Sequence, residues 1–171
     1  AGILSKSMGL PIHHFIASTN ANDTIPRYIK EGLYEPHFTK KTISNAMDVS
    51  DPSNFIRIQK IFNSDLQKLR KNVSSFSFND TETEDAMRLL YNSCNYLTCP
   101  HSAVGYLGLK KFMDMNKISN VNGIFISTAH CIKFKDVVEN SISTIIKYPK
   151  SINDILNKEK KSLSIESYSE L

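Results

Sequence analysis

Apolar residues along this chain occur in two patterns: short unbroken runs, and longer stretches with an apolar residue at every third or fourth position. Unbroken runs cover residues 13–18, bounded by Pro11 and an Asn-rich stretch, and residues 124–127, preceded by Gly123. Runs of this length are typical of strands buried on both faces, as in parallel sheets. We therefore expect two buried strands, and a short third strand where polar and apolar residues alternate over residues 74–78.

Helical spacing predicts most of the remaining elements. Local end signals support several of them: Gly32 follows the last periodic position of one helix, and Asp51 and Pro52 precede another. Thr24, and Thr81 paired with Glu84, are residue types that cap helix starts. The predicted helices cover residues 3–8, 24–32, 52–71, 81–94, 101–115 and 129–146, the last with a break near residue 140.

Helices that alternate with short buried strands favour an α/β fold with three layers around a parallel sheet. The α/β region is expected to span residues 1–149, and residues 150–171 form a polar C-terminal extension. Ligands of such folds bind beyond the carboxyl ends of the strands. Small polar residues follow both predicted strands and suit such a site, but they equally suit helix capping without a ligand: Asn20, Asn22, Asp23, Ser127, Thr128 and His130.

Composition narrows the classes of function. The 171 residues carry a net charge of +4, but 17 of the 21 basic residues are Lys, and acidic residues are scattered among them. This pattern lacks the features of a nucleic-acid interface, so no nucleic-acid partner is expected. No apolar run approaches the roughly 20 residues of a membrane span, so no membrane partner is expected either. The three cysteines, without metal-ligand spacing, indicate reduced thiols in the cytoplasm and no metal site.

Four segments together resemble the threonine synthase family of bacteria and fungi. Residues 127–134, Ser-Thr-Ala-His-Cys-Ile-Lys-Phe, are similar to its Ser-Thr-Ala-His-Pro-Ala-Lys-Phe segment. Residues 44–55 are similar to its Met-Asp-Val segment ending in Ser-Asn-Phe, residues 17–23 to its Ala-Thr-Asn-x-Asn-Asp segment, and residues 100–105 to its Pro-His-x-Ala-Val segment. The four segments occur in the family's order, so the resemblance is specific although each segment alone is weak.

The resemblance implies a pyridoxal 5'-phosphate enzyme of the tryptophan-synthase β-like fold, also called fold type II. Enzymes of this family convert O-phosphohomoserine and water to threonine and phosphate, the last step of threonine biosynthesis. The Schiff-base Lys of the family, and the Gly-Asn-Phe-Gly loop that cradles the cofactor phosphate, precede the matched region. We therefore expect this chain to be a C-terminal fragment that lacks the catalytic Lys.

Residue by residue, the resemblance assigns the Thr128 hydroxyl to the pyridine nitrogen of the cofactor, with Ser127 beside it. His130 lies in the same segment, where a buried structural role and a role in proton transfer both stay open. Cys131 stands where the family has Pro, which loosens the first helical turn without removing a ligand.

Six further residues are candidates for binding substrate or shaping the site, weighed against ordinary turn, cap and surface roles: Asn20, Asn22, Asp23, Ser53, Asn54 and Arg57.

Two other functions for the chain also stay open. A related lyase such as a threonine dehydratase uses the same cofactor, although the combination of residues 44–55 and 127–134 argues against it. A stand-alone α/β binding module without catalysis is the alternative if the chain is complete as given.

Overall fold

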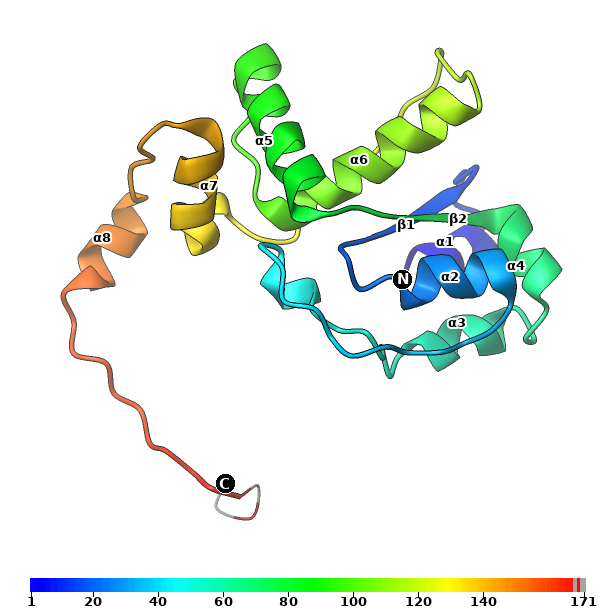
Figure 1. The fold of residues 1–171 in the computed structure, drawn as a ribbon, viewed down its shortest axis with the longest axis horizontal. Helices are drawn as coiled ribbons and strands as arrows, with labels where there is room; N and C mark the ends of the chain where they lie inside the picture. Colours follow the sequence, from blue (N-terminus) through cyan, green and yellow to red (C-terminus); the bar gives the residue numbers. More distant parts are fainter. Residues whose placement is uncertain (168, 170–171) are drawn as a thin grey trace.

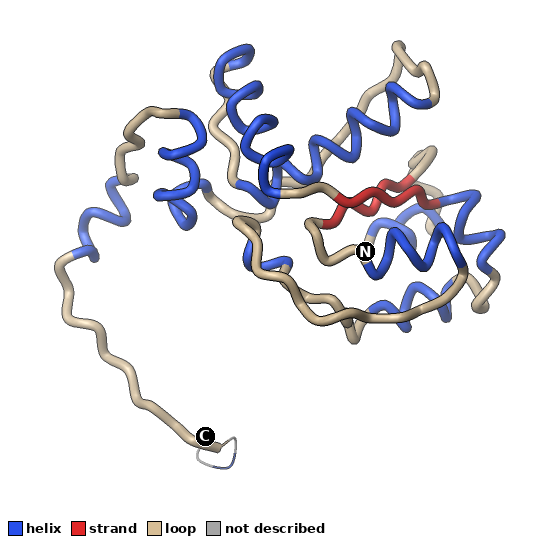
Figure 2. The backbone as a smooth tube through the Cα atoms, in the orientation of Figure 1, coloured by secondary structure: helices blue, strands red, loops and turns tan. Residues whose placement is uncertain are grey.

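The computed structural model describes residues 1–167 and 169 and shows two parallel strands surrounded by helices (Figures 1 and 2). The strands are β1 (Phe15–Thr19) and β2 (Val73–Ser77). The α-helices are α1 (Gly2–Ser7), α2 (Thr24–Glu31), α3 (Phe55–Ile61), α4 (Leu66–Asn72), α5 (Asp80–Cys94), α6 (Pro100–Met115), α7 (Lys135–Ile142) and α8 (Lys150–Leu156). Two short 3-10 helices are η1 (Asn45–Met47) and η2 (Cys131–Phe134).

The sheet lies between two layers of helices. β1 and β2 pair in parallel, with Phe15 opposite Val73 and Thr19 opposite Ser77. Helix α6 contacts β1, and α2 contacts both strands. Figure 1 shows α5 and α6 on one side of the strands and α1 to α4 on the other. This arrangement confirms the predicted three-layer α/β architecture with a parallel sheet.

Helix α6 lies directly on β1 because it has a glycine at the crossing. A Cβ atom at Gly108 would come within 1.8 Å of the Oγ atom of Ser18, so any larger residue would push the helix off the strand. The contact fixes the position of α6 relative to the carboxyl end of β1. That end is where the first group of candidate residues begins.

Two apolar clusters hold the layers together. The first lies beneath α2, α3 and α4, where the rings of Tyr28 and Phe55 meet edge to face with centroids 5.3 Å apart. The second lies between α5, α6, η2 and α7 and buries Met87, Ala103 and Val138 almost completely. Fully buried side chains of the size of Met87 and Val138 contribute roughly 1.5–3 kcal/mol each through removal of apolar surface from water.

Several predicted elements differ from the structure. Residues 124–127 form no strand and belong to the loop between α6 and η2. The predicted helix 52–71 starts only at Phe55 and is divided into α3 and α4 at Asn63 and Ser64, whose φ angles of 52° and 56° are left-handed. A right-handed helix cannot continue through two such residues, since each costs about 1–2 kcal/mol there.

The helix caps also differ. The capping box at the start of α5 joins Asn79 and Glu82, two residues before the predicted one. Asp23 occupies the N-cap position of α2 in place of Thr24. The predicted helix 129–146 is a 3-10 turn followed by α7, which runs unbroken through residue 140 and ends at Ser143 with a left-handed φ of 53°. Gly32, with φ of 89°, ends α2 as predicted.

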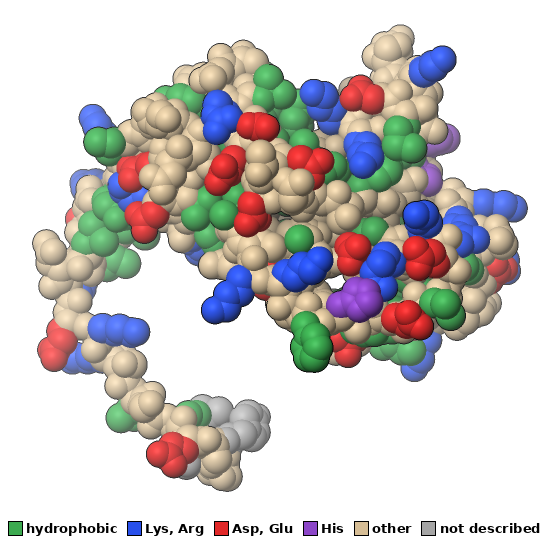
Figure 3. Space-filling view, in the orientation of Figure 1, with side chains coloured by type: hydrophobic (Ala, Val, Ile, Leu, Met, Phe, Trp, Pro, Cys, Tyr) green, Lys and Arg blue, Asp and Glu red, His purple; other side chains and the backbone are tan. Residues whose placement is uncertain are grey.

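Beyond α7 the chain leaves the body of the molecule. Figure 1 shows α8 and the residues after it extending away from the helices, and α8 buries none of its residues. The division into residues 1–149 and 150–171 stays a prediction, and residues 168, 170 and 171 lie outside the described residues. In Figure 3, basic and acidic side chains lie interspersed on the visible face. Within the described residues, no helix has the length and apolar content needed to cross a bilayer.

Candidate functional site

A buried cluster of polar side chains follows the carboxyl end of β1. The Asn20 side-chain amide donates to Ser44 Oγ at 3.1 Å and to Asp48 Oδ1 at 2.9 Å, and its Oδ1 accepts from the backbone N–H of Asn22 at 3.0 Å. Asp48 also accepts from the backbone N–H of Thr42 at 3.0 Å. We call Asn20, Asn22, Thr42, Ser44 and Asp48 the Asn20 cluster. It fastens the irregular segment 33–50 to the end of the strand.

The polar groups of the Asn20 cluster find their hydrogen-bond partners within the cluster and on the nearby backbone. Asn22 donates to the carbonyl oxygen of Lys40 at 2.9 Å and accepts from the backbone N–H of Lys40 at 2.8 Å. Asn20 is only 1% exposed. A buried polar group costs little when it is hydrogen-bonded and several kcal/mol when it is not. Asn20 and Asn22 therefore hold segment 33–50 in place, and their predicted role in shaping a site stays a prediction.

Asp23 has a different contact. Its carboxylate accepts from Nε of Arg27 at 3.1 Å, one turn further along α2. The same guanidinium donates to the carbonyl oxygen of Glu35 at 2.7 Å. Asp23 thus orients Arg27, which ties α2 to the start of segment 33–50.

Ser53, Asn54 and Arg57 lie at and just before the start of α3, and all three are exposed. The helix is held by Phe55, which is buried against Tyr28. Within residues 1–167 and 169, no side-chain hydrogen bond involves these three residues. Within the described residues, no hydrogen bond or ion pair links them to residues 127–130.

The first turn of α6 connects the Asn20 cluster to the second group of candidates. Nε2 of His101 accepts a hydrogen bond from the backbone N–H of Ala46 at 3.2 Å. The next residue, Ser102, donates from its hydroxyl to Ser127 Oγ at 3.0 Å. His101 and Ser102 were not among the predicted site residues, although they belong to the Pro-His-x-Ala-Val segment that carried part of the resemblance. His101 is buried.

The thiol of Cys99 precedes this turn at the N-cap position of α6. Burial raises its pKa, but hydrogen bonds from His101 and Ser102 outweigh burial and lower the pKa to about 7. The Ser102 contact, at 3.3 Å, is the firmer of the two. Nδ1 of His101 lacks a partner of standard hydrogen-bond geometry among the described residues. Since Nε2 is an acceptor, the ring proton resides on Nδ1, where it favours a nearby thiolate.

Thr128 and Ser127 lie in the extended segment that follows α6. Thr128 is exposed, and its hydroxyl forms no hydrogen bond with any residue that the structure describes. It does not cap the next helix, and neither does Ser127. The cap of η2 is His130, whose Nδ1 accepts from the backbone N–H of Ile132 at 3.1 Å. The hydroxyl of Thr128 is therefore free to bind a group from outside this chain.

Of the two roles left open for His130, the buried structural one does not fit this structure, because the residue is exposed. His130 lies at the start of η2, as expected. Its Nδ1 atom caps this 3-10 helix, a role that does not require burial. The other ring nitrogen, Nε2, forms no hydrogen bond within the described part of the chain and faces no competing partner.

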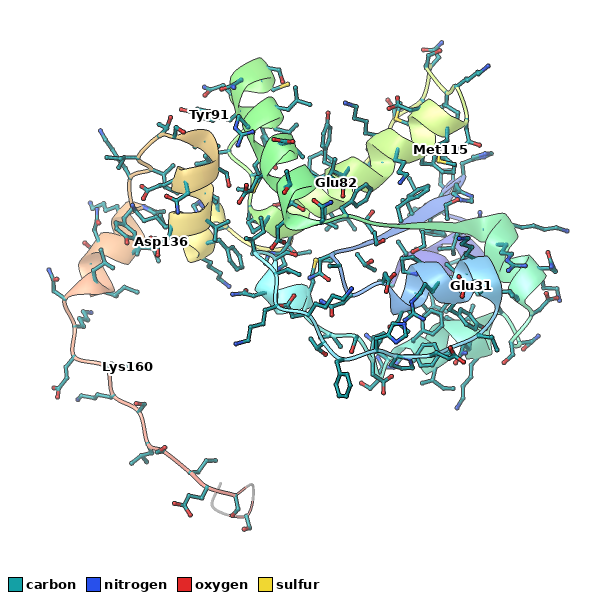
Figure 4. The ribbon with its side chains drawn as sticks, viewed as in Figure 1. Glu31, Glu82, Tyr91, Met115, Asp136 and Lys160 are labelled. Carbon is teal, nitrogen blue, oxygen red and sulfur yellow. The ribbon has the colours of Figure 1, made fainter. Side chains whose placement is uncertain are left out.

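A surface hollow of about 490 Å³ lies elsewhere in the molecule, lined by residues that include His14, Arg70, Phe76 and Phe112. Its α6 residues belong to the end of the helix that carries Met115, labelled in Figure 4. Ser102 is ten residues before Phe112, which at about 1.5 Å per residue places it roughly 15 Å away along the helix. The hollow contains none of the predicted site residues.

The residues at 127 and 128 fit the group that the resemblance implies. A ring nitrogen needs one donor in its plane, and the Thr128 hydroxyl is a donor with no competing partner in the described chain. Metal binding lacks such support, since the described residues contain no cluster of three His, Cys, Asp or Glu side chains suited to a metal ion.

Comparison with known proteins gives a consistent result. A sequence model described as "Threonine synthase, C-terminal" matches residues 102–170. The threonine synthase of Haemophilus influenzae is 43% identical over 153 residues, a match that covers 90% of this chain and 35% of that protein. The chain thus spans about a third of the length of the curated relatives it matches.

Solved structures agree. The crystal structure of threonine synthase from Escherichia coli matches 91% of this chain and 35% of its own, with a TM-score of 0.81 and 37% identity. The threonine synthase of Brucella melitensis, solved with bound PLP, matches 93% of this chain with a TM-score of 0.82 and 25% identity. The resemblance inferred from the four sequence segments is confirmed, as is the fold class.

Proposed function

We propose that this chain, which matches the C-terminal third of the threonine synthases in sequence and fold, forms the corresponding part of a threonine synthase. The enzyme uses pyridoxal 5'-phosphate and converts O-phosphohomoserine and water to L-threonine and phosphate. The chain contributes the side chain that meets the cofactor ring nitrogen. The Schiff-base Lys belongs to the part of the enzyme that this chain does not match.

The unpaired, exposed hydroxyl of Thr128 is the observation that carries this proposal. When bound, the cofactor stores the electron pair released at the substrate carbon. The Thr128 hydroxyl would hold the ring nitrogen of that cofactor by donating a hydrogen bond to it. Because an alcohol is neutral, it does not hold that nitrogen protonated as a carboxylate would, and phosphate elimination tolerates this weaker electron sink. Ser127 keeps the segment in place through its bond with Ser102.

The remaining candidates have supporting roles. Asn20 and Asn22 hold segment 33–50, whose residue Ala46 binds His101 at the start of α6. Arg57 is exposed beside Ser53 and Asn54, and its guanidinium matches the geometry of a carboxylate or phosphate of the substrate. His130 has a free Nε2 that can move a proton near Thr128.

The test is a single polypeptide in which this chain replaces the matching third of the Escherichia coli enzyme. We expect phosphate release from O-phosphohomoserine. Thr128→Val should lower kcat/KM by about 100-fold, the usual effect of losing one preorganised donor, and Thr128→Ser should restore most of it. Thr81→Val, at an exposed threonine on α5, is the matched control and should leave the rate unchanged.

Two results would reject the proposal. Release of ammonia from threonine without release of phosphate from O-phosphohomoserine would identify a dehydratase. A Thr128→Val variant as active as the unchanged chain would remove the hydroxyl from the mechanism.

We place the enzyme in the cytoplasm, where cysteines stay reduced, because Cys94, Cys99 and Cys131 are all free.

A further inference from the structure

The position of Thr128 depends on its neighbours, because its hydroxyl forms no hydrogen bond with any described residue. On one side, Ala129 packs against the apolar cluster between α5, α6, η2 and α7. On the other side, the described part of the chain forms no backbone–backbone hydrogen bond with residues 123–128. The contact of Ser127 Oγ with the Ser102 hydroxyl, at 3.0 Å, is therefore the hydrogen bond that restrains this side of Thr128.

Ser102 lies in a part of the molecule that is fixed at two points. It is 0% exposed and belongs to the first turn of α6. The helix lies against β1 at Gly108, where a Cβ atom would come within 1.8 Å of Ser18 Oγ. In the same first turn, His101 accepts a hydrogen bond from the backbone N–H of Ala46 at 3.2 Å. A hydroxyl on such a rigid helix can hold a loosely attached segment at a defined place.

The Ser102 hydroxyl has a second contact behind it. Its Oγ atom lies 3.3 Å from Sγ of Cys99, which is 1% exposed. A hydroxyl has one proton and two lone pairs, so Ser102 can accept from the Cys99 thiol while it donates to Ser127. When Cys99 is a thiolate, Ser102 donates to the sulfur and Ser127 donates to Ser102. The contact between the two serines can therefore be kept in both forms of Cys99.

We infer that Ser102 is a positioning residue for the proposed reaction: through Ser127, it holds the Thr128 hydroxyl in place for the cofactor ring nitrogen. Ser102 is buried and reaches Thr128 only through its neighbour. A hydrogen-bond donor contributes most to catalysis when it is already ordered before the reaction begins. The inference rests on the proposed function and adds the residue that orders Thr128.

The first experiment measures phosphate release by the single polypeptide that joins this chain to the remaining part of the Escherichia coli enzyme. Ser102→Ala should lower kcat about tenfold, the effect of losing one neutral hydrogen bond, and change KM by less than about twofold. In a Thr128→Val background, the same substitution should lower kcat by less than about twofold, because no hydroxyl is left to position.

Ser141→Ala is the matched control. Ser141 is 3% exposed on α7, and its hydroxyl donates to the carbonyl oxygen of Val137 at 2.7 Å. The substitution thus also removes a buried serine hydroxyl with a hydrogen bond, but one without a contact to residues 127 and 128. It should leave both kcat and KM unchanged.

The second experiment needs neither cofactor nor activity. Backbone order parameters from NMR relaxation of this chain should be near the rigid value of about 0.85 at Ser127 and Thr128. Ser102→Ala should lower them to below about 0.6, the range of a flexible backbone. Ser127→Ala, at an exposed position where truncation leaves the core intact, should produce the same fall. Ser141→Ala should leave them unchanged.

Three results would overturn the inference. Order parameters that do not change in either serine variant would show that the contact does not restrain Thr128. A tenfold loss from Ser102→Ala in the Thr128→Val background would mean that Ser102 acts elsewhere. A Ser127→Ala variant far less active than Ser102→Ala would mean that Ser127 meets the cofactor itself. A fall in the order parameters without any phosphate release supports the positioning and rejects the proposed activity, so the two failures are distinguishable.

Discussion

The Asn20 cluster and the segment 123–128 both follow from short apolar runs with polar residues at their ends, yet the structure treats them in opposite ways. In the first, Asn20 is 1% exposed and its amide is bonded on every side. In the second, Ile124 is 83% exposed and the Thr128 hydroxyl has no partner among the described residues. The first region is complete within this chain, and the second presents groups for something else to bind.

The difference arises from what each run has beside it. β1 has β2 as a parallel partner, and the backbone N–H of Phe78 bonds the carbonyl oxygen of Thr19 at 3.0 Å, which closes the end of the sheet. Residues 123–128 pair with no strand in the described part of the chain and pack on α6 and on Tyr96. A two-stranded sheet is marginal by itself, so the helices and the Asn20 cluster contribute much of the stability of the first region.

The largest effect is expected from a substitution in the Asn20 cluster. Asn20→Ala leaves the buried N–H of Asn22 without its acceptor and removes the donor to Ser44 and Asp48, and we expect a loss of about 3 kcal/mol in the free energy of unfolding. Urea denaturation measures this loss. Asn116→Ala, at an exposed asparagine after α6, is the control and should change stability by less than about 0.5 kcal/mol. Equal effects of the two substitutions would contradict a structural role for the cluster.

A smaller effect tests how the open segment is held. Phe125→Ala removes the ring that packs on Tyr96 and Tyr106. Because Phe125 is only partly buried, we expect a loss of about 2 kcal/mol, less than the cost at a fully buried phenylalanine. Thermal unfolding of the isolated chain is the measurement. No change in the melting temperature would show that the segment does not pack along α6.

The thiol of Cys99, which lies between the two regions, makes the free energy of unfolding depend on pH. The pKa of Cys99 is lowered to about 7 in the folded chain, against about 8.5 in an unfolded one. Stability from its thiolate is therefore present above pH 8.5 and is lost as pH falls through 7. We expect the difference in unfolding free energy between the unchanged chain and Cys99→Ser to grow by about 1 kcal/mol over this range.

Denaturant titrations at several pH values provide this measurement. Burial raises the pKa of Cys131, so Cys131→Ser is the control and should not reproduce the rise between pH 7 and 8.5. A difference that stays flat with pH would show that Cys99 remains a neutral thiol.

The smallest effect on stability is expected at Ile126, on the uncovered face of segment 123–128. Ile126→Ser should change the stability of the isolated chain by less than about 0.5 kcal/mol, because the side chain is already 75% exposed. The adjacent Phe125→Ala is its matched counterpart. A cost at Ile126 as large as that at Phe125 would mean that both faces of the segment are already covered in this chain.

Local signals predicted some features well and others poorly. Gly32 marked the end of α2 correctly because the backbone preference of glycine acts within a single residue. The start of α5 was missed because two overlapping patterns, Asn79 with Glu82 and Thr81 with Glu84, both fit a capping box. The first is used, since Asn79 comes directly after the last residues held to β1.

The sequence by itself determined the relation to the threonine synthases and most of the helices, because short motifs and helix periodicity depend on neighbours along the chain. Tertiary structure decided which of the candidate residues meet. His101 reaches Ala46 across 55 positions, and Ser102 reaches Ser127 across 25. Such contacts depend on how helices and loops pack, which no local pattern encodes. The same reason explains why a run that reads as a buried strand remains open at residues 123–128.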